Sequence, residues 1–162
     1  MNTVGIFNQG ITELNLGNPK KALSIFNKIL ELEPDNINAL LKKGNILGKF
    51  GKYTESILIY DKVLSIESQN ILALVNKGLA LHYLARYDEA IACFDVVLKT
   101  NPNNTIALYN MASSLIKHGK TSEGLKILER TIKIDYSFKY KAKLDIDFQH
   151  ILLDNNFKKL IS

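Results

Sequence analysis

Ile71–Asn104 reads ILALVNKGLALHYLARYDEAIACFDVVLKTNPNN, and this stretch decides the fold. The sequence repeats with the spacing that separates Gly10 from Gly44 and Gly44 from Gly78. At this spacing, residues of the same kind recur along the chain. Two small positions and one bulky position recur, held in turn by Gly10, Gly44, Gly78 and Ala112; by Ala22, Ser56, Ala90 and Gly124; and by Phe26, Tyr60, Phe94 and Leu128. A fixed period kept over four registers indicates an array of structural repeats.

Each repeat is predicted to be a pair of helices that cannot bury their apolar faces alone. In the third repeat the helices are expected from about Leu72 to Leu84 and from about Asp88 to Lys99. Gly78 allows the second helix to approach closely, and Ala90 faces it at the crossing. The ring of Phe94 then fills the space that two small residues leave between the helices.

Glycines recur in the turn inside each pair. Gly17, Gly51 and Gly119 stand where a residue with positive φ is expected to end the first helix. Ala85 occupies the same position in the third repeat, so it is predicted to carry a small conformational cost.

These recurring residues resemble the pattern of the tetratricopeptide repeat family. The match is carried in the third repeat by a large apolar residue, a Lys-Gly pair, a leucine, a small residue, an aromatic, an apolar residue and a proline: Leu74, Lys77-Gly78, Leu81, Ala90, Phe94, Val97 and Pro102. The fourth repeat departs from the pattern at Ala112, Gly124, Thr131 and Tyr136, so looser packing is expected there. The tryptophan of the family is replaced by Ile6, Leu40, Leu74 and Leu108.

The resemblance implies an all-α fold, a right-handed α-solenoid of four tetratricopeptide helix pairs with a C-terminal capping helix. The repeats are expected at residues 3–36, 37–70, 71–104 and 105–138, and the capping helix and tail at residues 139–162. Apolar spacing predicts one helix over residues 139–153, which Asp154 ends. At the other end Thr3 and Thr12 replace apolar or small residues, as expected for the uncovered first face of a solenoid.

Composition favours a folded chain rather than a disordered one. Of the 162 residues, 46% are hydrophobic, 23% are charged and three are prolines, which is typical of folded domains. The sequence holds no apolar run of membrane-spanning length and begins with no secretory signal pattern, so we expect a cytoplasmic protein without membrane contact. Its one cysteine, Cys93, is interpreted as a small packing residue.

No catalytic pattern is present. The histidines His82, His118 and His150 occur singly, and the sequence contains no glycine-rich phosphate loop and no nucleophile signature. His82 is interpreted as a hydrogen-bonding surface residue. We therefore expect neither an enzyme nor a cofactor, and no metal site.

The resemblance implies that a concave surface lined by the first helices binds the partner. Carried over by position, the groove residues are Phe7, Asn8, Asn38, Leu41, Lys42, Asn45, Val75, Asn76, Leu79, Tyr83, Tyr109 and Asn110. Phe7, Leu41, Val75 and Tyr109 form an apolar row, and Asn8, Lys42, Asn76 and Asn110 form a polar row beside it. Asparagine amides donate and accept at once, so the polar row can hold an extended backbone. It can equally satisfy neighbouring polar groups of the protein itself, and the sequence leaves both interpretations open.

The chain is accordingly expected to be a non-catalytic adaptor for a protein or peptide partner, as a monomer or weak homo-oligomer. The clamp that some family members use for chaperone tails is not expected, because Leu41, Ile106 and Asn110 replace its basic residues.

The alternative is electrostatic binding of an acidic protein or nucleic acid through the basic segment 117–143, which carries a net charge of 8 − 3 = +5. Its basic residues are Lys117, Lys120, Lys126, Arg130, Lys133, Lys139, Lys141 and Lys143. Helical phase spreads them over different faces, so direct nucleic-acid binding is not expected.

Overall fold

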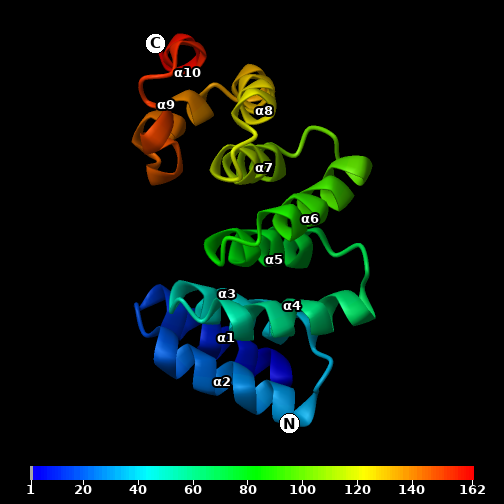
Figure 1. The fold of residues 1–162 in the computed structure, drawn as a ribbon. Helices are drawn as coiled ribbons and strands as arrows, with labels where there is room; N and C mark the ends of the chain where they lie inside the picture. The colour runs from blue at the N-terminus through cyan, green and yellow to red at the C-terminus, as the bar shows by residue number, and fades with distance from the viewer. Residues whose placement is uncertain (1) are drawn as a thin grey trace. The chain divides into compact units, whose positions relative to one another are not determined.

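The computed structural model describes residues 2–162, which form helices and no strand (Figure 1). The helices are α1 (Thr3–Asn15), α2 (Pro19–Leu32), α3 (Ile37–Lys49), α4 (Tyr53–Ile66), α5 (Ile71–Tyr83), α6 (Tyr87–Thr100), α7 (Thr105–Lys117), α8 (Thr121–Ile134), α9 (Ser137–Leu144), the 3-10 helix η1 (Ile146–Ile151) and α10 (Asn155–Ile161). The all-α solenoid architecture predicted from the sequence is thereby confirmed.

The starts of the helices follow the period of the sequence. The first helices of the pairs begin at Thr3, Ile37, Ile71 and Thr105, at the same spacing that separates Gly10 from Gly44. An asparagine stands before each of the last three, and its side-chain oxygen accepts the N–H of the third helical residue, at 3.0 Å for Asn36, 3.0 Å for Asn70 and 2.9 Å for Asn104. These side chains satisfy backbone donors that the helix leaves unpaired.

Each helix pair turns through one residue with positive φ. The φ angles are 75° at Gly17, 72° at Gly51, 86° at Gly119 and 57° at Ala85. The predicted positive φ is therefore confirmed at all four positions, including the alanine that is strained there.

The chain forms two compact units, and the boundary between them falls within α5. Unit 1 ends at Ala80, and unit 2 runs from Leu81 to Ser162. In unit 1 the first two helix pairs cross at Gly10 and Gly44. A Cβ atom would lie 2.7 Å from the Phe26 ring at Gly10 and 2.6 Å from the Tyr60 ring at Gly44. Both distances are too short for a real contact, so glycine is required at these crossings.

In the last pair of unit 2, α7 and α8, the small residues have exchanged places. Ala112 stands on α7 where the other pairs carry glycine, and Gly124 faces it on α8. A Cβ atom at Gly124 would press on the Ile116 side chain and lie 2.9 Å from the Ala112 carbonyl oxygen. Ala112, Leu128 and Thr131 are fully buried, so this pair is closely packed and the looser packing expected from the sequence is wrong.

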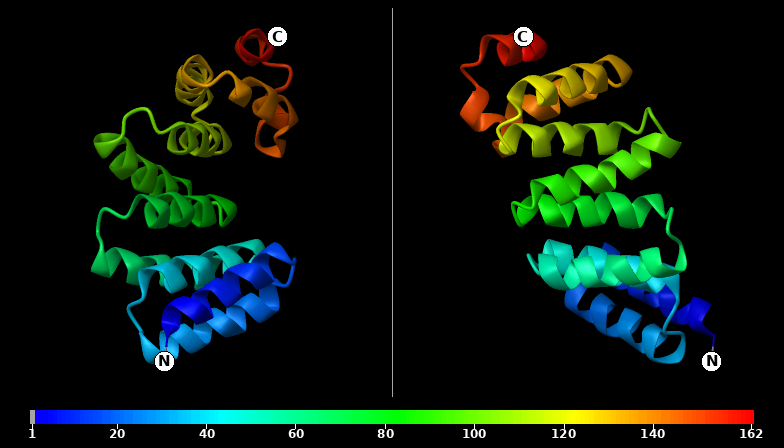
Figure 2. Two further views of the ribbon diagram at one scale, coloured as in Figure 1. Left: turned by 180° about the vertical axis from the view of Figure 1, so that it is seen from behind. Right: turned by 45° about the vertical axis from the view of Figure 1, so that its right-hand side comes forward.

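The C-terminal cap differs from the single helix expected over residues 139–153. Helix α9 ends at Leu144, because Asp145 caps η1 by accepting the N–H of Asp147 at 3.1 Å. Asp154 caps α10 in the same way. Figure 2 shows α8, α9 and α10 gathered at one end of unit 2. There Phe148 and Phe157 are fully buried in one core with Tyr109, Leu125 and Leu128.

Candidate polypeptide-binding site

The C-terminal segment lies on α7, where it contacts the predicted groove residue Tyr109 and, one helical turn later, Ser113. The Tyr109 hydroxyl donates to Asp145 Oδ2 at 2.6 Å, and the Ser113 hydroxyl donates to Asp147 Oδ2 at 2.6 Å. Tyr109 is only 1% exposed and Ser113 only 3%. In the last repeat, the groove positions thus hold a polypeptide segment that belongs to the chain itself.

His82, at the end of α5, takes part in the same contact. Its Nδ1 lies 2.9 Å from Ser114 Oγ, and its Nε2 lies 3.1 Å from Asp147 Oδ2. The ring is 5% exposed, so the expectation that His82 is a surface residue is wrong. The repeat pattern could not reveal this role, because Asp147 lies beyond the last repeat.

The electrostatics keep Asp147 ionised. Burial by itself would raise the pKa of the Asp147 carboxyl, but the hydrogen bonds from His82 and Ser113, with the charges of His82 and Lys117, outweigh it and lower that pKa. Burial, followed by the bond to Asp145, raises the pKa of the Tyr109 hydroxyl far above its ordinary range. The Tyr109 hydroxyl therefore stays protonated and remains a donor. The Tyr109 ring packs against the rings of Phe138 and Phe148 in the cap.

Ser114, His82 and Asp147 include the residue types of a hydrolytic triad, but the serine is not placed as a nucleophile. Ser114 is fully buried, and its hydroxyl donates to the Asn110 carbonyl oxygen at 2.9 Å. A nucleophile must reach its substrate with its proton directed to a base. The three side chains instead fasten the C-terminal segment to α5 and α7.

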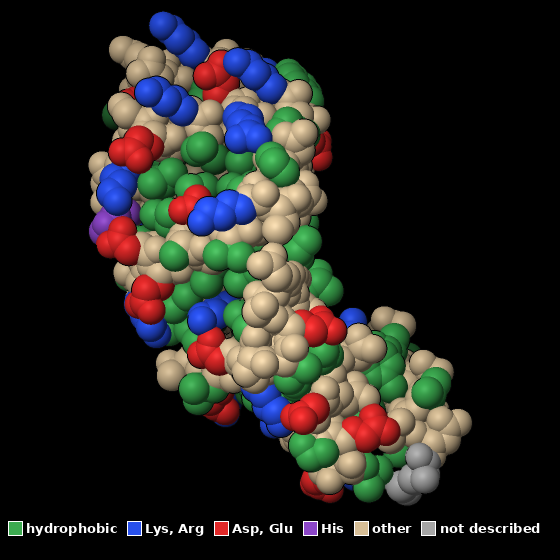
Figure 3. Space-filling model, turned by 90° about the vertical axis from the view of Figure 1, so that its right-hand side faces the viewer, with side chains coloured by type: hydrophobic (Ala, Val, Ile, Leu, Met, Phe, Trp, Pro, Cys, Tyr) green, Lys and Arg blue, Asp and Glu red, His purple; other side chains and the backbone are tan. Residues whose placement is uncertain are grey.

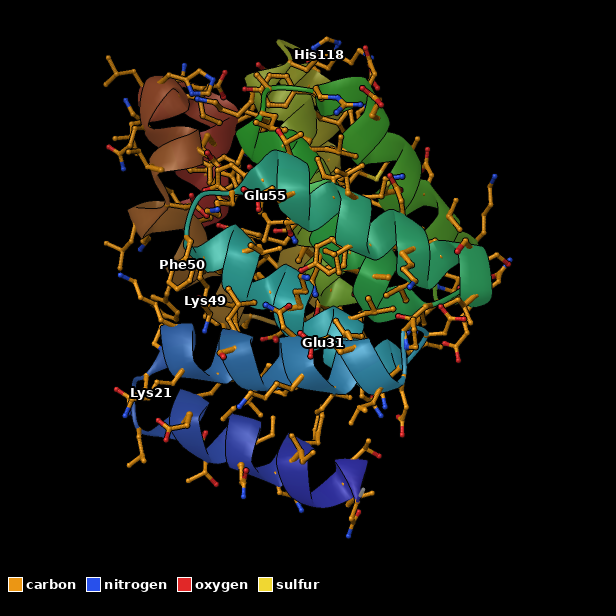
Figure 4. The ribbon with its side chains drawn as sticks, turned by 90° about the horizontal axis from the view of Figure 1, so that it is seen from below. Lys21, Glu31, Lys49, Phe50, Glu55 and His118 are labelled. Atoms are coloured by element: carbon orange, nitrogen blue, oxygen red, sulfur yellow. The ribbon has the colours of Figure 1, made fainter. Side chains whose placement is uncertain are left out.

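In unit 1 the predicted groove residues are not covered in this way. Asn8 and Asn38 are exposed, Phe7, Lys42, Asn45, Asn76 and Leu79 are half-buried, and Leu41 and Val75 are buried. Figure 4 labels Lys49, the last residue of α3, and Phe50, which follows it. The remaining predicted residues belong to unit 2, where Tyr83 is exposed and Asn110 is half-buried.

Three side chains form a hydrogen-bonded cluster at the centre of unit 1. Asn45 Oδ1 accepts from the Tyr60 hydroxyl at 2.6 Å and from Asn76 Nδ2 at 2.9 Å. Burial raises the pKa of Tyr60 to about 12, so this hydroxyl remains a donor at neutral pH. Two donors occupy both lone pairs of the Asn45 oxygen, which leaves the amide N–H groups of Asn45 for another acceptor.

The basic segment 117–143 is largely engaged in local contacts. Arg130 donates to the Pro102 carbonyl oxygen at 2.7 Å, Lys133 pairs with Glu129 at 2.7 Å, and Lys120 lies 3.5 Å from Asp88. On the face drawn in Figure 3, basic and acidic side chains are interspersed.

None of the helices between residues 2 and 162 is long and apolar enough to cross a membrane. Within the same described residues, no three His, Cys, Asp or Glu side chains come together as ligands for a metal ion.

Two protein-family models match the chain. One is described as Tetratricopeptide repeat and matches residues 7–71; the other is described as Anaphase-promoting complex, cyclosome, subunit 3 and matches residues 53–131. No curated protein matches the sequence.

Several solved structures share the fold. The structure described as MamA 41-end from Desulfovibrio magneticus RS-1 is 18% identical with a TM-score of 0.82, over 99% of this chain and 94% of that one. One described as Crystal structure of MamA is 20% identical with a TM-score of 0.79, over 94% and 90% of the two chains. A third, described as MamA AMB-1 P212121, is 24% identical with a TM-score of 0.76, over 84% and 80%.

The period of the helix pairs, their small crossing residues and both family models lead to the same assignment. Repeats of this kind bind protein partners and generally carry no catalytic machinery, so the chain is a protein-interaction scaffold in its broad role. It belongs to the tetratricopeptide repeat proteins.

Proposed function

We propose that this scaffold binds an extended polypeptide segment on the first-helix face of unit 1. This face is formed by the groove positions of α1, α3 and the first part of α5: Phe7, Asn8, Asn38, Leu41, Lys42, Asn45, Val75, Asn76 and Leu79. No chemistry is required of it.

One observation carries the proposal. In the last repeat, Tyr109 and Ser113 hold a segment of polypeptide through side-chain hydrogen bonds. The equivalent positions one period and two periods earlier are Val75 and Leu79, and Leu41 and Asn45. The repeats share one backbone plan, so positions that bind polypeptide within the chain in one repeat are suited to bind it from a partner in others.

Exposure also supports the proposal. Asn8 and Asn38 are exposed, and Phe7 and Leu79 are half-buried, so polar and apolar atoms are both accessible. Main-chain hydrogen bonds can provide affinity on such a face, and the apolar row can select side chains.

A selection from a random peptide library, displayed on phage with no bias in charge, tests this function. Peptides enriched on the wild-type protein are synthesised, and their dissociation constants are measured by fluorescence anisotropy. The double variant Asn8→Ala with Lys42→Ala should weaken binding about fivefold or more, since each lost hydrogen bond contributes about 0.5–1.5 kcal/mol. Neither side chain is buried, so folding should persist.

The matched control is Lys21→Ala with Lys28→Ala on α2, where both lysines are exposed. It should leave the dissociation constants unchanged. Enriched peptides that bind the Asn8/Lys42 variant as tightly as wild type would remove the first-helix face of unit 1 as the binding surface.

A further inference from the structure

We infer that the C-terminal segment, residues 145–162, is held closed by a proton on His82, so that it binds unit 2 more firmly in mildly acidic than in mildly alkaline solution. His82 is buried, and it contacts both α7 and this segment. Both contacts lie within unit 2. The closure therefore does not depend on the function proposed for unit 1.

The proton of the Ser114 hydroxyl is already in use. This hydroxyl lies 2.9 Å from the Asn110 carbonyl oxygen. A carbonyl oxygen can only accept, so the serine is the donor of that bond. The Ser114 oxygen therefore presents a lone pair to His82 Nδ1, which lies 2.9 Å away. Nδ1 must carry a hydrogen to form a bond with it.

The second ring nitrogen of His82 faces a carboxylate. Nε2 lies 3.1 Å from Asp147 Oδ2, which also accepts the Ser113 hydroxyl at 2.6 Å. Burial would raise the Asp147 pKa, but the bonds from His82 and Ser113 lower it, so this carboxyl is ionised and has no hydrogen to donate. Nε2 must therefore carry a hydrogen as well. Only the imidazolium form of histidine has a hydrogen on both nitrogens.

Loss of the proton leaves one of these bonds unmade. If the remaining hydrogen stays on Nε2, the Ser114 hydroxyl must turn away from Asn110 to donate to Nδ1. If it stays on Nδ1, the lone pairs of Nε2 and Asp147 face each other. In both cases the bond to Asp147 loses the positive charge of the ring, and bonds between two ionised groups are the stronger ones.

The position of His82 on its helix also favours the charged ring. Helix α5 ends at Tyr83, so His82 lies in its last turn. The unpaired carbonyl groups at the end of a helix carry partial negative charge, which stabilises a cation there. The helix end and the carboxylate of Asp147 thus act on the ring in the same direction.

The other groups around the ring come from α5, α6 and α7. Tyr83 and Tyr87 present aromatic rings, with centroids 5.7 and 5.4 Å from that of His82. On α7, the charge of Lys117 acts on Asp147 and helps to keep it ionised. The charges named here thus set one carboxylate against the ring and one lysine beside that carboxylate.

The direction of the pH dependence follows from this arrangement. Histidine is the side chain that most readily exchanges a proton near neutral pH. A proton that is bound in the closed state and released on opening makes closure more favourable as the pH falls and less favourable as it rises. In stronger acid the gain ends, because Asp147 then takes up a proton as well.

Nuclear magnetic resonance of the full-length, isotopically labelled protein tests the protonation directly. The ring-nitrogen signals of the exposed His118 and His150 are identified from His118→Gln and His150→Gln, which leaves those of His82. At about pH 7, where exposed histidines are mostly neutral, both nitrogens of His82 should be protonated, and one should lose its hydrogen by about pH 9. One bare nitrogen at the lower pH, or two protonated nitrogens at the higher pH, would overturn the inference.

Cleavage by a protease of broad specificity measures the opening of the segment. Cleavage within residues 145–153 is followed by mass spectrometry for wild type and His82→Gln. The ratio of the two rates cancels the pH dependence of the protease itself. Glutamine both donates and accepts, as a neutral imidazole does. The variant should be cleaved about tenfold faster than wild type at about pH 6.5, and less than about threefold faster at about pH 8.5.

His118→Gln is the matched control for this cleavage. His118 also belongs to unit 2, but its ring lies 3.3 Å from Asp88 on α6 rather than against the C-terminal segment. Its rate relative to wild type should stay near one at both pH values. Equal ratios for His82→Gln at the two pH values, or a ratio for His118→Gln that changes as much, would overturn the inference. If His82→Gln does not fold, the resonance spectra of the wild type decide alone.

Discussion

Ser113 and Asp147 are separated by one full period of the repeat, and the hydroxyl of the first donates to the carboxylate of the second across 2.6 Å. A fifth helix pair would place residue 147 on its own first helix, in the position that Ser113 has on α7. The chain leaves the helix at Leu144 instead, and residue 147 turns back to cover the face of its own equivalent. The segment that follows the last helix pair thus covers the first-helix face of that pair.

The first prediction concerns the crossing of α3 and α4. Gly44→Ala would place a Cβ atom 2.6 Å from the Tyr60 ring, so we expect a loss of about 1–3 kcal/mol from the free energy of unfolding. Gly48→Ala on the same helix is the control, because its Cβ would lie 3.6 Å from Ser56 Oγ, an ordinary contact. That variant should be neutral or stabilised by up to about 1 kcal/mol through helix propensity. Urea denaturation of both proteins measures the difference, and equal midpoints would contradict the prediction.

The second prediction concerns the turn between α5 and α6. Ala85 has a φ of 57°. This conformation costs an L-residue about 1 kcal/mol and costs glycine little. Ala85→Gly should therefore raise the free energy of unfolding by about 0.5–1 kcal/mol. Gly119→Ala makes the opposite change at a φ of 86° and should lower it by about 1 kcal/mol. Thermal denaturation of the two variants should move the midpoint in opposite directions; shifts of the same sign would be evidence against the strain.

The third prediction concerns acid. The pKa of Asp147 in the folded protein is below its ordinary 3.8, so the ionised carboxylate favours folding. Its contribution to stability is fully present well above pH 3.8, and it is lost as the pH falls through the folded pKa. Asp147→Asn should lower the free energy of unfolding at pH 7 by about 2 kcal/mol.

The difference between wild type and Asp147→Asn should begin to shrink as the pH falls toward 3, because the unfolded chain then takes up a proton at Asp147 more readily than the folded protein, whose Asp147 pKa is lowered. Denaturation at pH 7, 5 and 3 measures the profile. Asp95→Asn, at an exposed position of α6, is the control and should follow the wild-type profile. A difference between wild type and Asp147→Asn that stays constant from pH 7 to pH 3 would mean that the charge of Asp147 does not stabilise the cap.

The fourth prediction concerns the C-terminal cap. Phe157 is fully buried with Phe148, Leu125 and Leu128, so Phe157→Ala should cost about 3–5 kcal/mol. Leu153 is the control, because its side chain is 83% exposed. Leu153→Ala should change stability by less than about 0.5 kcal/mol.

Limited proteolysis gives a second readout for the cap. In the Phe157→Ala variant, cleavage should concentrate after residue 144, because the segment from Asp145 onward loses part of its core while the helix pairs of unit 1 keep theirs. Cleavage spread evenly over the helix pairs would mean that the cap and the repeats unfold together.

The sequence predicted those parts of the fold that repeat. Helix starts, crossing residues and turn conformations recur at one spacing, so Gly44 and Ala85 could be interpreted from residue type and position alone. The cap could not be predicted in the same way, because each of its contacts occurs once. One local signal for its break is present: Asp145 is a favourable N-cap residue directly after Leu144.

The candidate site was predictable only as a set of positions. Tyr109 was placed on the groove face from the register, yet the sequence does not show that the Asp145 carboxylate covers it. For Asn76, residue type allowed both a ligand contact and a structural role. In the structure, Asn76 donates to Asn45, which is a structural role. The sequence could not predict this bond, because sequence spacing does not give the separation of the two helices that carry these residues.

The exchange of Ala112 and Gly124 also bears on how such proteins can be rebuilt by recombination. A chimera that joins α7 to a second helix of the α4 type would set the Cβ of Ala112 against an aromatic ring at the position of Tyr60, where a Cβ at Gly44 would lie 2.6 Å from the ring. Joining α3 to α8 would set Gly44 against Gly124 and leave a void there. Repeats of this chain should therefore be transferable only as whole helix pairs. In a set of shuffled variants, those with crossover points between pairs should fold, and those with crossover points within a pair should not.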